Sequence, residues 1–261
     1  MLFLNLFPIP RRYERVPGAL AFALTAAMVI YFAKEGTQLS LILMVTSVIL
    51  LVFVYALKAR QRQEWNRFFQ EENRRLLNIK GADGPKRYVA EQRSVVAKLR
   101  NRELKTSAQL NLSTGLLANA DPSGALEVLE KMDPTKFPNP TLALVYWTQM
   151  LGAHLQRHDS ERIEAAYQMA LATLDEVSDM LKISFMPSEI QYRLSRGEYE
   201  LALNQLSEIP TADLDEAGKH LLTALRIVAM RGVGAVEKAN KLTAQLSGCD
   251  LLPSTRALLL Q

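Results

Sequence analysis

Two histidines four residues apart are the clearest candidate for chemistry in this chain. His154 and His158 would share one face of a helix, a spacing that can ligate zinc. Asp159 and Glu161 follow closely and could add carboxylate ligands. A zinc protease motif needs glutamate directly after the first histidine, and this chain has Leu155 there. We favour the alternative, a polar helix end with two solvated imidazoles, and predict neither a metal nor a cofactor.

Other reactive groups do not form a recognisable catalytic set. The chain has one cysteine, Cys249, so it has no internal disulfide, and the neighbouring carboxylate of Asp250 would not favour a nucleophilic thiolate. The segment from Gly81 to Gly84 lacks the Lys-Ser/Thr pair of nucleotide-binding loops. We therefore predict that the protein is not an enzyme, with an independent enzyme as the least favoured alternative.

Charge separates along the chain although the net charge is only +4. Residues 58–105 carry fourteen basic and six acidic side chains, whereas residues 106–261 carry thirteen basic and nineteen acidic ones. A basic protein can attract nucleic acid, but the acidic distal part argues against a nucleic-acid partner. Attraction to anionic lipid headgroups explains the basic stretch better.

Two apolar stretches, residues 16–33 and 39–57, follow each other near the start. Each is close to the ~20 residues that a helix needs to cross a hydrocarbon core of ~30 Å. The five residues between them allow only a turn, so we predict a transmembrane helical hairpin over residues 16–57. Neither stretch contains Asp, Glu, Lys, Arg or His, which favours an anchor over a transport path. Small residues in the spans permit close helix packing, including contacts in a homo-oligomer.

Basic residues on both sides of the hairpin predict its orientation. Cytoplasmic flanks carry the excess of Lys and Arg, so we expect both termini in the cytoplasm, in a membrane that the short hairpin suggests is the bacterial cytoplasmic membrane. Residues 1–15 would form a basic interfacial segment. A cleaved signal peptide is the alternative, which is disfavoured because a second span follows at once. The basic residues expected at the membrane surface are Arg11, Arg12, Arg15, Lys58, Arg60, Arg62 and Arg67.

Residues 58–79 contain neither Gly nor Pro and should continue the second span as a helix. Trp65, Phe68 and Leu76 recur at helical spacing, so this face lies on the membrane, joins a short coiled coil or packs on the following domain. The sequence leaves these alternatives open. The segment from Gly81 to Pro85 breaks the helix. We therefore predict a basic juxtamembrane helix and linker over 58–86 and a second domain over 87–261.

The distal domain shows a helical pattern with short breaks and no strand-like alternation, so we predict an all-α fold. Its sharpest signal begins at Tyr192, where Gly197 allows a tight turn, Tyr199 starts a second helix, Ala202 permits close helix approach and Leu206 fills the space to the next pair. Prolines should fall between helices, at Pro134, Pro138, Pro140, Pro187 and Pro210.

This segment resembles the centre of a tetratricopeptide repeat. Three further segments align with it and place Ala125, Ala165 and Ala239 at the small position. The steps from Ala125 through Ala165 and Ala202 to Ala239 are 40, 37 and 37 residues, slightly longer than the family period of about 34 residues. The resemblance covers residues 88–250 and implies an α-solenoid of helix pairs. A generic α-solenoid with the same pairing is the alternative.

Two functions follow as expectations. The favoured one is a membrane-anchored helical-repeat scaffold that binds a protein or peptide partner at the cytoplasmic face, because stacked helix pairs form extended binding surfaces. The alternative is an accessory subunit of a membrane enzyme or transporter that acts through its transmembrane hairpin. In the first case the distal domain makes the decisive contact, and in the second case the hairpin makes it.

Overall fold

The computed structural model describes residues 38–212 and 214–260, and their regular structure is entirely helical. The expected all-α class is therefore confirmed for this part of the chain. The described residues divide into two compact units, one of residues 38–72 and one that begins at Asn73. The predicted first span, the turn after it and the basic residues Arg11, Arg12 and Arg15 lie outside the described residues.

Helix α2 runs from Gln38 to Leu77 and contains both the predicted second span and the predicted juxtamembrane helix. Its described apolar side chains between Val48 and Leu57 are mostly exposed, and exposed (i, i+4) ion pairs follow, with Arg67 Nε 3.2 Å from a Glu71 oxygen. Within the described residues, no helix combines the length and the apolarity needed to cross a membrane. The transmembrane hairpin therefore stays a prediction.

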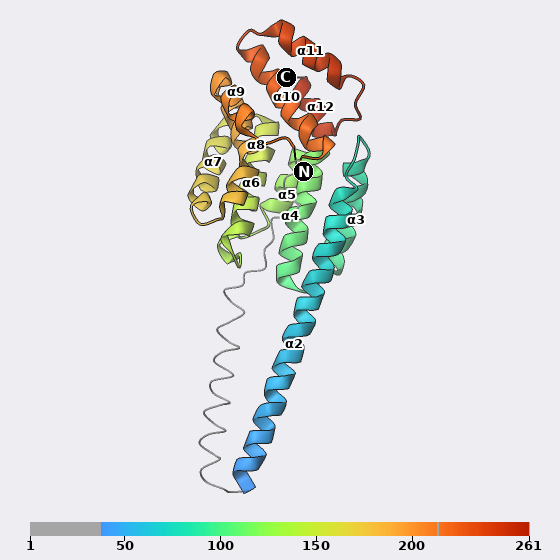
Figure 1. The fold of residues 1–261 in the computed structure, drawn as a ribbon, viewed down its shortest axis with the longest axis vertical. Coiled ribbons are helices and arrows are strands. Elements are labelled where there is room, and N and C mark those ends of the chain that lie inside the picture. Colours follow the sequence, from blue (N-terminus) through green and yellow to red (C-terminus); the bar gives the residue numbers. More distant parts are fainter. Residues whose placement is uncertain (1–37, 213, 261) are drawn as a thin grey trace. The chain divides into compact units, whose positions relative to one another are not determined.

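Ten α-helices and one 3₁₀ helix follow α2 in the described part of the second unit (Figure 1). They are α3 Gly84–Lys98, α4 Arg102–Ala118, α5 Pro122–Leu129, the 3₁₀ helix η1 Pro134–Lys136, α6 Pro140–Arg157, α7 Ser160–Leu174, α8 Asp179–Ser195, α9 Tyr199–Glu208, α10 Glu216–Gly232, α11 Val236–Leu246 and α12 Pro253–Leu259.

Even-numbered and odd-numbered helices have different neighbours in this unit. The even helices α4, α6, α8 and α10 pack against one another in chain order. Each odd helix between them packs on the even helix before it and the even helix after it, as α5, α7 and α9 do. This is the neighbour pattern of stacked helix pairs. The last helix, α12, packs on α10 and also on α4.

The four helix pairs are closed by one repeated backbone turn. A left-handed residue ends the even helix at Ala120, His158, Gly197 and Gly234, with φ between 56° and 78°. At Gly197, the N–H of the following residue donates to the Arg193 carbonyl at 3.0 Å and the Gly197 N–H donates to the Leu194 carbonyl at 3.1 Å. The other three turns make the equivalent pair of bonds. This is the Schellman arrangement of a helix C-terminus.

Two of these four turns use a residue other than glycine, which yields a stability prediction. A side chain at left-handed φ costs about 1–2 kcal/mol, partly offset by the larger unfolded-state entropy of glycine. We expect Ala120→Gly to raise the free energy of unfolding by roughly 0.5–1 kcal/mol, measured by chemical denaturation. The reverse change, Gly197→Ala, should lower it. Changes of the same sign in both variants would contradict the turn assignment.

One predicted break was wrong. Pro187 does not separate two helices but lies inside α8. The ring removes one backbone hydrogen bond, but Phe185 and Ile190 on either side of it are 3% and 0% exposed. Burial of this face outweighs the lost hydrogen bond, so the helix continues.

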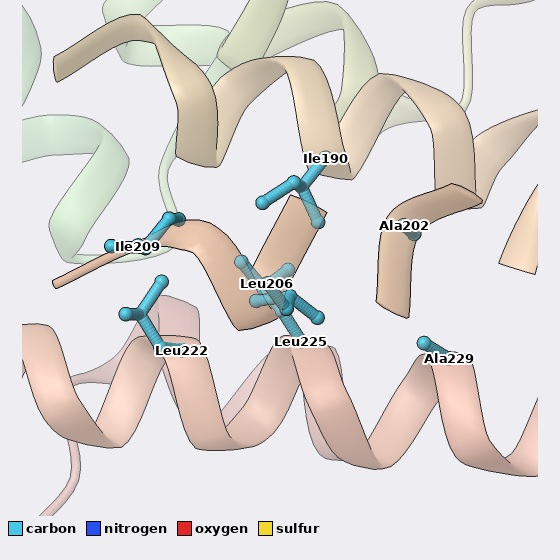
Figure 2. Close-up of a cluster of buried hydrophobic side chains, with 7 residues drawn as sticks. All are labelled: Ile190, Ala202, Leu206, Ile209, Leu222, Leu225 and Ala229. Atoms are coloured by element: carbon cyan, nitrogen blue, oxygen red, sulfur yellow. The ribbon is translucent and has the colours of Figure 1, made fainter. Parts of the chain in front are cut away.

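The interior between α8, α9 and α10 is a compact apolar cluster (Figure 2). Ile190 comes from α8, Leu206 from α9 and Leu225 from α10, and all three are at most 1% exposed. Ala202 and Ala229 are also fully buried in this cluster. Small side chains at these two positions let the helices approach closely.

Candidate interaction surface

The repeated turn shows which residues of the four helix pairs are equivalent more accurately than residue type does. Five residues after each left-handed residue, a backbone N–H donates the first hydrogen bond of the odd helix, at Ala125, Ile163, Ala202 and Ala239. The three alanines are fully buried, and Ile163 is 7% exposed. Ala165, by contrast, is exposed. The predicted alignment of this second segment was therefore displaced by two residues, because an alanine was expected where the chain uses isoleucine.

The Gly197 turn positions Tyr199 against the following helix pair. An added Cβ at Gly232, the last residue of α10, would lie 2.3 Å from the Tyr199 ring. Tyr199 thus packs directly on the α10 backbone, and Gly232 is needed for that approach. The sequence identified Tyr199 but not its partner, which is 33 positions further along the chain.

A tyrosine, a glutamate and an arginine form a polar cluster on the surface between α7 and α8. The Tyr192 hydroxyl donates to Glu164 Oε2 at 2.6 Å, and Arg196 Nη1 lies 3.3 Å from the same oxygen. The Tyr192 ring stacks on Tyr167 with centroids 3.7 Å apart. Burial, followed by the bond to Glu164, raises the pKa of Tyr192. The bond from Tyr192 in turn lowers the pKa of Glu164, which holds a fixed negative charge.

Two side chains of this polar cluster are accessible from solvent. The Glu164 and Arg196 side chains are 46% and 52% exposed. Their geometry is held from inside by the buried Tyr192 ring. The sequence indicated Tyr192 only as part of the repeat. Arg196 follows it by four residues at the end of α8, whereas Glu164 belongs to α7 and meets Tyr192 only in the fold.

Two open hollows in the second unit have several cations and one carboxylate each among their lining residues. Arg75, Lys80 and Arg87 line the first, which has a volume of about 340 Å³. The second has a volume of about 290 Å³ and lies between the start of α4 and η1, with four cations and one carboxylate among its lining residues. These cations are Arg102, Lys105, Lys131 and Lys136. A partner that carries acidic groups would find complementary charge in both hollows.

Four of the basic residues predicted at a membrane surface fall on described residues, and they belong to α2. Lys58, Arg60, Arg62 and Arg67 are all exposed. Arg60 and Arg67 lie within ion-pair distance of glutamates one turn further along, at 3.7 Å and 3.2 Å. Exposed pairs of this kind contribute little to stability.

The two candidate metal ligands do not share a helix face. His154 is 2% exposed inside α6. His158 is exposed and leaves the helix with φ 57°, at the left-handed position of the turn. Asp159 Oδ2 lies 3.6 Å from His154 Nδ1 and 3.7 Å from Arg162 Nε. Among the described residues, no group of three or more His, Cys, Asp and Glu side chains could hold a metal ion.

Burial of His154 predicts a pH dependence of stability. Burial lowers the pKa of His154, and the Asp159 carboxylate only partly opposes this effect. The unfolded chain therefore takes up a proton near the ordinary pKa of 6.5, while the folded chain does so only at lower pH. The free energy of unfolding should fall as the pH drops below 6.5, by no more than about 1.4 kcal/mol per pH unit.

Chemical denaturation between pH 7 and pH 5 tests this dependence. We expect His154→Gln to flatten the slope and His158→Gln, at the exposed turn position, to leave it unchanged. An equal slope in the wild type and His154→Gln would show that His154 does not cause the dependence.

Comparisons with known protein families, with curated proteins and with solved structures returned no match to this chain.

Proposed function

We propose that this protein is a membrane-anchored scaffold whose helical array binds a protein or peptide partner at the cytoplasmic face. The repeated turn carries the proposal, because it marks four helix pairs with one backbone geometry. The even helices of these pairs pack in chain order. Stacked pairs of this kind expose long surfaces that accommodate extended peptides or helices.

The array is a degenerate relative of the tetratricopeptide repeat in this proposal. The left-handed turn residues recur at positions 120, 158, 197 and 234, close to the family period of 34 residues. At the position of the small residue in the second helix of each pair, the first, third and fourth pairs have alanine and the second pair has Ile163. The longer period and the isoleucine explain why only the segment around Gly197 shows the family pattern clearly.

The N-terminal hairpin is the anchor in this proposal. Its support is the pair of apolar stretches at 16–33 and 39–57 and the basic residues that flank them. The exposed apolar side chains of α2 between Val48 and Leu57 need a nonpolar environment, which a bilayer would supply.

Membrane extraction and thiol labelling test the anchor. We expect the full chain to resist carbonate extraction. In a Cys249→Ser background, Gly36→Cys should react with an impermeant maleimide from outside the cell, whereas wild-type Cys249 should react only after permeabilisation. Release by carbonate, or the opposite labelling pattern, would contradict the proposed topology.

The same exposed apolar run of α2 supports the second candidate, an accessory subunit that acts through its hairpin. Crosslinked affinity purification of the full chain, beside a chain with an unrelated two-helix anchor, separates the two functions. A partner recovered with both chains supports the scaffold. A partner recovered only with the native hairpin supports the accessory subunit.

A further inference from the structure

The last residues of the chain join the end of the array to its beginning. We call residues 248–260 the C-terminal segment. Its helix α12 follows α10 in the layer of even helices, as the next even helix would. It also packs on α4, the first even helix after α3. One short element therefore contacts both the first and the last of the even helices α4, α6, α8 and α10.

The start of the C-terminal segment contacts the loop between α2 and α3. The Ala82 N–H donates to Asp250 Oδ1 at 3.0 Å. Gly81 has φ +66°, and an added Cβ there would lie only 1.7 Å from Asp250 Oδ2. Leu252 packs on the apolar cluster of Leu76, Ile79 and Tyr88. The Asp250 carboxylate thus binds the loop backbone, while Leu252 packs on the apolar residues that flank the loop.

Side chains and a backbone carbonyl of α12 contact the rest of the protein. Thr255 is 1% exposed, and Leu258 packs on the cluster between α8, α9 and α10. The Arg231 guanidinium donates to the Leu259 carbonyl at 2.9 Å. The C-terminal segment thus accepts two polar contacts, one from Arg231 through a backbone carbonyl and one from the Ala82 N–H through the Asp250 carboxylate. Any amphipathic helix that follows an acidic residue and a leucine can supply the same groups.

Two features make this helix exchangeable. It has only 7 residues, and isolated helices shorter than about 12–15 residues are not stable in water, so α12 forms only on its binding surface. It is preceded by residues without regular structure, from Ser247 to Leu252. The segment can therefore leave without unwinding a neighbouring helix.

We propose that the surface of α4, α10 and the 79–82 loop is the partner-binding site of the array and that the C-terminal segment is its internal occupant. The partner is a short amphipathic helix preceded by an acidic residue and leucines, as in Asp250–Leu252. Binding requires exchange of one helix for the other, so the site is closed in the free protein. This inference rests on the proposed scaffold function and identifies its surface and the class of its partner.

The single cysteine provides a direct measure of opening, because Cys249 adjoins Asp250 and is half-buried. We expect Gly81→Ala, whose Cβ would collide with the Asp250 carboxylate, to raise the thiol labelling rate at least about tenfold. Gly234→Ala is the matched control, since Gly234 has φ +78° and nothing within 4 Å of an added Cβ. It carries the same backbone strain and should leave the rate near that of the wild type. Asp250→Ala removes the acceptor without adding an atom and should also raise the rate.

Exchange is tested with a labelled peptide of residues 248–261 added to the full chain. We expect saturable binding to the Asp250→Ala variant, whose binding surface is unaltered, and much weaker binding to the wild type and to Gly234→Ala. Gly81→Ala should also bind the peptide weakly, because its added Cβ would collide with Asp250 of the peptide. A peptide with Thr255→Lys should not bind, because this position is buried.

Three results would overturn the proposal. The first is equal Cys249 reactivity in Gly81→Ala and Gly234→Ala together with no increase in Asp250→Ala. The second is failure of the peptide to bind the Asp250→Ala variant. The third is a concentration-dependent dimer of this variant that the peptide cannot dissociate, which would assign the site to a second copy of the chain. If the peptide exchanges but the anchor-replaced chain captures no partner, exchange stands and the scaffold function fails.

Discussion

Replacing Leu206 by alanine is expected to lower the free energy of unfolding by about 2–5 kcal/mol. Leu206 is 1% exposed and comes from α9, and its side chain meets Ile190 from α8 and Leu225 from α10 (Figure 2). Truncation removes apolar contacts and leaves a cavity that three helices cannot close together. The size of the effect reflects the position of Leu206 where two successive helix pairs meet.

Leu201→Ala is the control, because Leu201 lies on the same helix and is 50% exposed. It should change the free energy of unfolding by no more than about 0.5 kcal/mol. Chemical denaturation followed by circular dichroism measures both. Losses of similar size would contradict the burial of one face of α9.

Two glycines in helix interiors should respond to alanine with opposite signs. At Gly115 in α4, an added Cβ would lie 2.6 Å from Tyr88 Cδ1 and 3.1 Å from Val89 Cγ2. Tyr88 is 3% exposed and has little room to move. We expect Gly115→Ala to destabilise the protein by about 1–3 kcal/mol, because it forces α3 and α4 apart.

Gly152 in α6 provides the comparison. The nearest atom to an added Cβ there is Leu117 Cδ1 at 3.6 Å, an ordinary contact. Alanine is the better helix former by about 1 kcal/mol, so Gly152→Ala should stabilise the protein by up to that amount. The same denaturation experiment measures both. A stabilising Gly115→Ala would contradict the close packing of α3 on α4.

The local backbone conformation could be predicted from the sequence at positions where the residue type favours that conformation. Gly197 occupies a left-handed position, and Tyr199 begins the next helix, as the sequence indicated. Ala120 and His158 occupy the same left-handed position without being glycine. The fold imposes this conformation on them at a cost in strain, and for that reason the sequence did not reveal a uniform repeat.

Contacts between distant residues could not be predicted from the sequence. Gln149 of α6 shows this, because it is buried and its amide donates to the Leu110 carbonyl of α4 at 3.0 Å and to Thr114 Oγ1 at 2.7 Å. The Asp250 contact with Ala82 joins residues 168 positions apart. Side-chain type alone carries no information on either pairing. The candidate partner surface depends on such contacts, and the sequence therefore indicated the helical array but not this surface.

Chemical denaturation of residues 73–261, produced without the first 72 residues, tests most directly whether the array is a self-contained module. These residues retain Leu76, Ile79 and Tyr88, on which the C-terminal segment packs. The account predicts a mostly helical fragment with one cooperative unfolding transition that Leu206→Ala shifts to lower denaturant. A fragment without a cooperative transition would contradict it, because the array would then depend on the N-terminal segment for its fold.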